Sequence, residues 1–394
     1  MGGRFGTGRN GVGLIVSPPD LNARWSLDLP KTHKVPVSWF KTYASAPIRW
    51  RLSTEILPDG AATEVEIGDL RAELLSYRKI AQAVKKQQHN GLWARNILGI
   101  APAKTQGITD VGTVARYRQL LELGVPSHER CFRLANRTLF RILSRDPDPA
   151  LLFEFRKFAK TYPEIGPWAR GLMREASTAA LARAGLWEDP RVRGAAHRIA
   201  TDNSHFLRSE LAANPFVKKG SRWVLNPAAR PPTIFSVAIL AFLPRFQRER
   251  AGFVDRLASY LAKPAPRRTY VLQFGRKVVQ PTFYVLGEPL KADSTGHPKD
   301  LPFALHWIEL LVRLGQLESS SAANRILGRL LKDCNKHGVW SPKGLRTFAK
   351  SPSKLADFAY PLEIDAKNAE RRRADVTFRL SLIAKLAGWE LEYT

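Results

Sequence analysis

The sequence contains few of the residues that stabilise small secreted proteins. Only Cys131 and Cys334 are present among 394 residues, and they are too few and too far apart to suggest a disulfide framework. The apolar run from Val12 to Val16 is too short for the core of a signal peptide. We therefore expect a cytoplasmic protein.

Long apolar runs and the motifs of common enzyme classes are also missing. The longest apolar run, Ile234 to Leu243, is about half of the roughly 20 residues that a membrane span needs, so it predicts a buried helix and no transmembrane segment. No phosphate-binding loop, His-Glu-x-x-His zinc helix or nucleophile elbow occurs. The sequence nominates no catalytic residue, metal or cofactor, and it leaves open whether the chain is an enzyme.

Acidic residues are scarce relative to basic ones. The chain has 62 Lys and Arg against 35 Asp and Glu, a formal charge of +27 that is spread along its length. Such an excess favours an anionic partner, with nucleic acid first and lipid, acidic protein or a phosphorylated small molecule as alternatives. A basic surface that is merely solvated is the other interpretation.

Apolar residues that recur at three- and four-residue spacing indicate amphipathic helices over most of the chain. Residues 1–45 show no such period and are rich in Gly, Pro and basic residues, so we predict an extended basic N-terminal arm there. Residues 46–394 form the predicted helical domain. Within it, residues 264–300 hold several Pro and Gly and are interpreted as an irregular insertion.

Two internal echoes indicate a repeated helix pair. Residues 120–124 followed by 135–143 recur as residues 310–315 followed by 323–331, each copy reading as a helix, a Gly stop and a second helix. The segment Gln87 to Trp93 recurs as Asn335 to Trp340, where a helix ends in Gly and Trp follows. Stacked pairs of this kind form a solenoid or a closed ring, unless the similarity is chance. The predicted class is all-α.

A short β-hairpin is predicted within the insertion. Residues 268–274 and 277–280 are rich in β-forming residues and flank Gly275 and Arg276. Gly at the first turn position suits a tight hairpin.

The helix that ends before Gly91 and Trp93 resembles the repeat of the squalene-cyclase and protein-prenyltransferase superfamily. Together with residues 46–51 and the helix from Leu120 to Gly124, it is similar to uncharacterised bacterial relatives of that superfamily. The resemblance covers residues 46–394 and implies an α/α toroid whose central cavity takes an isoprenoid or lipid-like ligand. A HEAT-like α-solenoid is the alternative fold.

The sequence departs from the catalytic motifs of that superfamily. The Asp-rich DxDD motif is absent, and the nearest analogue, Asp146-Pro147-Asp148, lacks the third acid and is interpreted as a loop. The superfamily's zinc ligands are an Asp, a Cys and a His from separated positions. Here Asp333, Cys334 and His337 come from one helix end, so no zinc site is expected.

Clusters of basic and aromatic residues are the stronger functional signal. Cations neutralise phosphates and rings stack on exposed bases, unless the rings pack inward and the cations are only solvated. A third basic cluster is Arg371 to Arg373. The predicted nucleic-acid-binding residues are Lys218, Lys219, Arg222, Arg267, Arg268, Arg276 and Lys277 for phosphate, with Trp223 and Tyr270 for stacking.

The leading hypothesis is therefore a catalytically silent helical-repeat protein that binds a polyanion, with nucleic acid first. One alternative is a terpenoid-cyclase-like or prenyltransferase-like enzyme that acts on a lipid-like substrate in a central cavity. Another is a DNA-repair enzyme on helical repeats, which needs an acid and aromatic residues facing the DNA. The candidate general bases, His205, His297 and His306, are more often structural residues.

Overall fold

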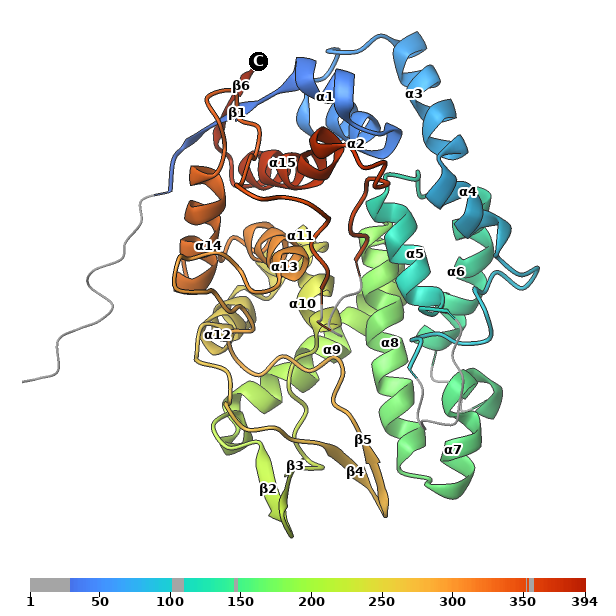
Figure 1. Ribbon diagram of the computed structural model, residues 1–394. Helices are drawn as coiled ribbons and strands as arrows, with labels where there is room; N and C mark the ends of the chain where they lie inside the picture. The colour runs from blue at the N-terminus through green and yellow to red at the C-terminus, as the bar shows by residue number, and fades with distance from the viewer. Residues whose placement is uncertain (1–28, 101–109, 145–147, 352, 354–357) are drawn as a thin grey trace, which may run out of the picture.

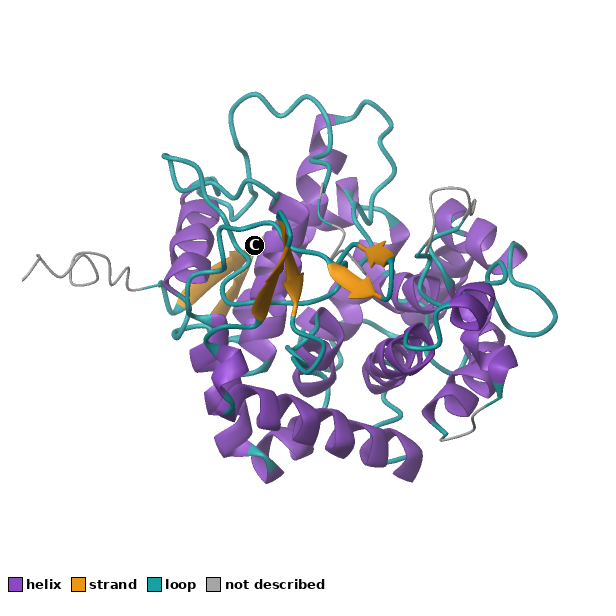
Figure 2. Cartoon of the chain, turned by 90° about the horizontal axis from the view of Figure 1, so that it is seen from below, coloured by secondary structure: helices purple, strands orange, loops and turns teal. Residues whose placement is uncertain are grey.

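The computed structural model describes residues 29–100, 110–144, 148–351, 353 and 358–394. Helices make up most of this part of the chain, and the strands are few and short (Figures 1 and 2). The α-helices are α1 (Val37–Tyr43), α2 (Ala46–Arg51), α3 (Glu64–Ser76), α4 (Arg78–Lys85), α5 (Thr113–Glu122), α6 (Arg130–Leu143), α7 (Arg156–Thr161), α8 (Ile165–Arg183), α9 (Pro190–Arg208), α10 (Ile234–Ala241), α11 (Pro244–Glu249), α12 (Ala251–Leu261), α13 (Leu301–Arg313), α14 (Ser321–Lys332) and α15 (Ala369–Leu386). Shorter helical turns are η1 (Leu52–Ile56), η2 (Pro149–Phe155) and η3 (Glu210–Ala212).

The strands of the described chain pair two by two. Strands β1 (Thr32–Val35) and β6 (Glu390–Tyr393) run parallel, so the two ends of the described chain meet. This pair and α1 show that residues 32–43, within the predicted N-terminal arm, carry regular structure, whereas residues 1–28 lie outside the described part. The antiparallel pairs are β2 (Phe216–Lys219) with β3 (Arg222–Leu225) and β4 (Leu272–Phe274) with β5 (Lys277–Val279).

The first sequence echo corresponds to two helix pairs with the same helix ending. Helix α5 ends before Gly124, whose φ is 92°, and the N–H of Val125 donates to the carbonyl of Leu120 at 3.0 Å. Helix α13 ends before Gly315, whose φ is 65°, and the N–H of Gln316 donates to the carbonyl of Leu311 at 2.9 Å. Both are Schellman endings, which favour Gly because its φ is positive. Helices α6 and α14 follow as the second members.

The second echo forms the same turn twice. The N–H of Gln88 donates to the carbonyl of Leu92, and the N–H of Asn335 donates to the carbonyl of Val339, both at 2.9 Å. Gly91 and Gly338 lie at the tips, and each has a positive φ. An added Cβ at Gly338 would meet the backbone of Lys34, so only glycine fits there.

The predicted buried helix is confirmed as α10. All eight of its residues are buried, and a reciprocal capping box between Thr233 and Ser236 begins it. Helix α8 packs against both α5 and α10, α13 packs against α10 and α15, and α15 packs against α1, α2 and β1. None of the helices within the described ranges is long and apolar enough to cross a membrane.

Candidate functional site

Two hairpins project together from one end of the molecule, at the bottom of Figure 1. In the first, Lys219 pairs with Arg222 across the turn Gly220-Ser221, and the φ of Gly220 is 59°. In the second, Phe274 pairs with Lys277 across Gly275, whose φ is 53°. Two-residue hairpin turns need a positive φ at their first position, which glycine adopts without strain. The second hairpin confirms the hairpin that the sequence predicts, although its strands are shorter.

The two hairpins are joined by backbone hydrogen bonds. The N–H of Val271 donates to the carbonyl of Trp223 at 3.0 Å, and the N–H of Leu225 donates to the carbonyl of Val271 at 2.9 Å. This short parallel bridge brings together residues that are far apart in the sequence. We name the result the hairpin surface. Its residues are Lys218, Lys219, Arg222, Trp223, Arg267, Arg268, Tyr270, Arg276 and Lys277.

The cations of the hairpin surface face solvent. Six of the seven are exposed, and Lys277 is half-buried with its Nζ 5.1 Å from the ring centroid of Phe158. None of the seven forms a salt bridge within the described ranges. The sequence explains this, because residues 211–248 and 256–287 contain no Asp or Glu. The surface therefore carries positive charge that no neighbouring acid along these segments neutralises. The exposed members are Lys218, Lys219, Arg222, Arg267, Arg268 and Arg276.

The aromatic members of the hairpin surface pack largely against protein. Trp223 is half-buried, and the Arg268 guanidinium carbon lies 4.2 Å from its ring centroid. The ring of Tyr270 lies 4.9 Å from that of Phe216, and burial raises the pKa of the Tyr270 hydroxyl. The rings thus support the strands, while the cations are the accessible groups.

The third basic cluster does not join the hairpin surface. Arg371, Arg372 and Arg373 lie in the first turns of α15, at the opposite end of the molecule in Figure 1. Arg372 pairs with Asp365 at 3.0 Å and Arg373 pairs with Glu370 at 2.9 Å. Two of its three cations are therefore already partnered.

A buried ionic cluster that the sequence does not reveal lies among α2, α5, α13 and α15. Arg379 Nη1 lies 2.8 Å from Glu122 Oε1, and its Nε lies 2.5 Å from Asp375 Oδ1. Arg51 Nη1 donates to the carbonyl of Glu122 at 2.9 Å. We name this set, with His306, Glu309 and Arg313, the central ionic cluster. Burial disfavours the charged form of Glu122, but Arg379 and Arg183 outweigh burial and lower the pKa of Glu122 to about 2.

Part of this cluster has the residue types of a metal site. Ligand atoms of Glu122, His306 and Glu309 lie within 4.8 Å of one another, and neither ring nitrogen of His306 has a hydrogen-bond partner among the described residues. However, both oxygens of Glu122 already accept hydrogen bonds, from Arg379 and from the N–H of Ala359. Glu309 pairs with Arg313 at 2.9 Å. Because these carboxylates are engaged by guanidinium and amide donors, we assign the cluster to the core.

Two of the remaining sequence candidates, His297 and Asp148, have local partners. His297 Nε2 lies 2.8 Å from Asp333 Oδ2, and Arg329 also pairs with Asp333. Asp333 is therefore engaged by these two residues. His205 is exposed near the end of α9. Asp148 accepts the N–H of Ala150 at the start of η2, while residues 146 and 147 lie outside the described part.

Comparison with protein-family models, with curated proteins and with solved structures finds no match to this chain. The geometry and charge of the hairpin surface are therefore the basis on which a function is proposed.

Proposed function

We propose that this protein binds nucleic acid through the hairpin surface. The observation that carries the proposal is the bridge between Val224 and Val271, which joins two hairpins that bear exposed cations. A two-stranded β-ribbon fits the major groove of duplex DNA, and Lys and Arg on such a ribbon reach the phosphates on either side. The Gly220-Ser221 turn between Lys219 and Arg222 gives the ribbon a narrow tip.

The phosphate contacts are assigned to the six exposed cations of the hairpin surface. Each phosphate that a cation neutralises releases counterions. On B-DNA each such contact therefore lowers the logarithm of the binding constant by about 0.9 for every tenfold rise in salt concentration. Arg268 is held over Trp223 and Phe216, with its guanidinium carbon 5.8 Å from the Phe216 centroid. This stacking orders the guanidinium before nucleic acid arrives, which lowers the entropy lost on binding.

The central ionic cluster does not supply the acid that cyclase chemistry needs. A cyclase that protonates its substrate needs a buried acid with a raised pKa beside an open aromatic cavity. Glu122 and Glu309 have lowered pKa values, because nearby guanidinium groups outweigh the effect of burial. Among the described residues of the cluster, these acids are salt-bridged to Arg379 and Arg313. For the fold we retain the α/α toroid as a proposal, supported by the repeated helix pairs and by the β1–β6 pairing of the chain ends.

The test is fluorescence-anisotropy binding to labelled DNA and RNA, single- and double-stranded, over a range of salt concentrations. We expect the triple variant Lys218→Ala, Lys219→Ala and Arg222→Ala to bind more weakly and to flatten the logarithmic salt slope by up to about 3 units. The matched control removes the same charge from exposed positions of α14 and the turn after it: Arg325→Ala, Lys332→Ala and Lys336→Ala. Equal losses in both variants, or no binding by the unmodified protein at low salt, would contradict the proposal.

A further inference from the structure

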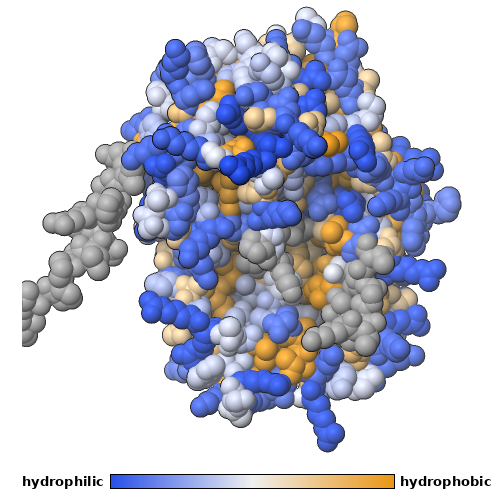
Figure 3. Space-filling view, viewed as in Figure 1, coloured by the Kyte–Doolittle hydropathy of each residue, from blue (hydrophilic) through white to orange (hydrophobic). Residues whose placement is uncertain are grey.

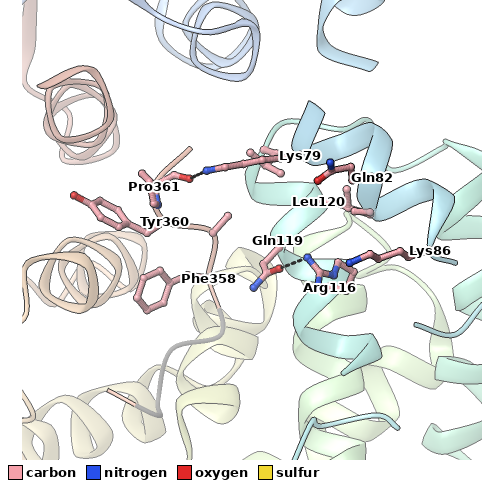
Figure 4. A pocket seen from close by; sticks show the side chains of 12 residues that line it. Lys79, Gln82, Lys86, Arg116, Gln119, Leu120, Phe358, Tyr360 and Pro361 are labelled. Atoms are coloured by element: carbon pink, nitrogen blue, oxygen red, sulfur yellow. Dashed lines mark hydrogen bonds between the residues drawn. The ribbon is translucent and has the colours of Figure 1, made fainter. Parts of the chain in front are cut away.

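A second site lies away from the hairpins, between α4, α5 and the segment 358–361. It is a cavity of about 290 Å³, and its walls come from three separate parts of the chain (Figure 4). Lys79 and Gln82 reach it from α4, Lys86 from the C-cap of that helix, and Arg116 and Gln119 from α5. Its size suits a small molecule and is too small for a polymer.

One side of the cavity is lined by basic and amide side chains, and the other side is apolar. Its charged side chains are Lys79, Lys86 and Arg116, and no carboxylate is among the described residues that line it. The amides of Gln82 and Gln119 lie beside these cations. The other side is apolar, with Leu120, Leu123 and Phe358 among its residues. Such a lining suits a ligand that has an anionic group at one end and an apolar ring at the other.

Two of the cations are held in place and keep donors available. Lys79 Nζ donates to the carbonyls of Pro361 and Glu363, the latter at 2.6 Å, so the third N–H of its ammonium group is not used by these bonds. Arg116 donates to Gln119 Oε1 at 3.2 Å and to Asp110 Oδ1 at 3.1 Å. The Arg116 Nε is buried and has no hydrogen-bond acceptor among the described residues. A buried N–H without an acceptor is costly, and an anionic ligand would satisfy it.

The central ionic cluster fixes the floor of the cavity. The N–H of Ala359 donates to Glu122 Oε2 at 2.8 Å, and the carbonyl of Ala359 accepts from Arg379 Nη2 at 2.5 Å. The N–H of Leu362 donates to Asp375. The Phe358 ring stacks on His306, with centroids 5.0 Å apart. Because buried side chains hold both backbone groups of Ala359, the floor is organised before a ligand binds.

We infer that this cavity binds a small phosphate monoester that carries an apolar ring. The phosphate contacts Lys86 and Arg116, and the ring lies against Leu120 and Leu123. A planar guanidinium and an ammonium group complement the dianionic charge of a phosphate monoester. The site is separate from the hairpin surface and does not depend on nucleic-acid binding.

The test is isothermal titration calorimetry with phenyl phosphate as the probe and inorganic phosphate as the ring-free comparison. We expect one phenyl phosphate per chain, bound more tightly than phosphate. The variants Lys86→Ala and Arg116→Ala should each lower its affinity by about tenfold, the typical worth of a charge-assisted hydrogen bond. The control Lys85→Ala removes an exposed cation of the same helix that does not line the cavity, and it should bind as the unmodified protein does.

The hairpin triple variant separates this inference from the proposed function. It should bind phenyl phosphate unchanged even where it loses nucleic acid, and Lys86→Ala, at an exposed position, is not expected to disturb the fold. Circular dichroism confirms that each variant is folded. Absence of phenyl phosphate binding, or an equal loss of affinity in Lys85→Ala and Lys86→Ala, would overturn the inference.

Discussion

The guanidinium of Arg268 lies over the indole ring of Trp223, with its central carbon 4.2 Å from the ring centroid. One residue comes from the first hairpin and the other from the segment that leads into the second. The contact therefore works with the Val224–Val271 bridge to make one surface from two sequence-distant segments. Cation–π contacts of this kind contribute about 0.5–1 kcal/mol at exposed positions.

Substitutions of Trp223 and Arg268 should separate the contribution of the positive charge to binding from the contribution of holding the guanidinium in place. Trp223→Leu keeps every cation but removes the platform under Arg268, so nucleic-acid affinity should fall by roughly threefold, as expected for the loss of one cation–π contact, with an unchanged salt slope. Arg268→Ala should lower both the affinity and the slope, the slope by about 0.9 units. Salt titrations by fluorescence anisotropy measure both quantities. An unchanged slope in Arg268→Ala would remove this residue from the phosphate contacts.

The two turns of the second sequence echo are anchored in the same way. The N–H of Trp93 donates to Thr113 Oγ1, and the N–H of Trp340 donates to Thr377 Oγ1, both at 3.1 Å. Thr113→Val and Thr377→Val should each lower the free energy of unfolding by about 1–3 kcal/mol, because each leaves a buried N–H without this acceptor. Urea unfolding measures the change. A loss at one position and none at the other would argue that the two turns are not equivalent.

Glu122→Gln should destabilise the protein strongly. It removes the charge that partners Arg379 in the core, where breaking a buried pair costs about 3–5 kcal/mol. The comparison is Glu392→Gln, whose carboxylate lies 3.9 Å from Lys34 Nζ at the surface and should change stability by less than about 1 kcal/mol. Chemical denaturation of both variants gives the two values. Similar small losses would show that the central ionic cluster contributes little to stability.

Acid should destabilise the protein partly through His306. Burial lowers the pKa of His306 from 6.5 to about 3, with Glu122, Glu309, Arg118 and Arg183 around it. Between these pH values the unfolded chain binds a proton that the folded protein does not, so the free energy of unfolding falls as pH decreases, by up to about 1.4 kcal/mol per pH unit. Burial lowers the pKa of His33 to about 4, which adds a dependence of the same sign.

The contribution of His306 can be isolated by substitution. His306→Gln should show a smaller loss of stability between pH 7 and pH 5 than the unmodified protein, measured by urea unfolding at both pH values. The same pH dependence in both proteins would show that His306 does not remain neutral in the folded state.

The helix endings of the first sequence echo are predictable because their signals are local. Gly124 and Gly315 end helices whose apolar spacing is regular, and Gly275 marks the second hairpin. The sequence does not predict the first hairpin, although Gly220-Ser221 is a two-residue turn signal. The basic pair Lys218-Lys219 weakens the β pattern there, so the sequence indicates only a charge cluster.

The bridge and the central ionic cluster were not predictable, because their members are distant in sequence. Val224 and Val271 belong to different hairpins, and Glu122 and Arg379 are separated by 257 residues in the sequence. One signal was available. Glu309 lies within the otherwise apolar run of α13, and an acid on a buried face requires a partner. The sequence did not identify Arg313 or any other partner for it.

Hydrogen–deuterium exchange with and without a short DNA duplex shows whether the two hairpins form one nucleic-acid-binding surface. We expect bound DNA to slow amide exchange in residues 216–225 and 268–279 together, while exchange in α14 is unchanged. Protection of α14 or of the first turns of α15 without protection of either hairpin would contradict it.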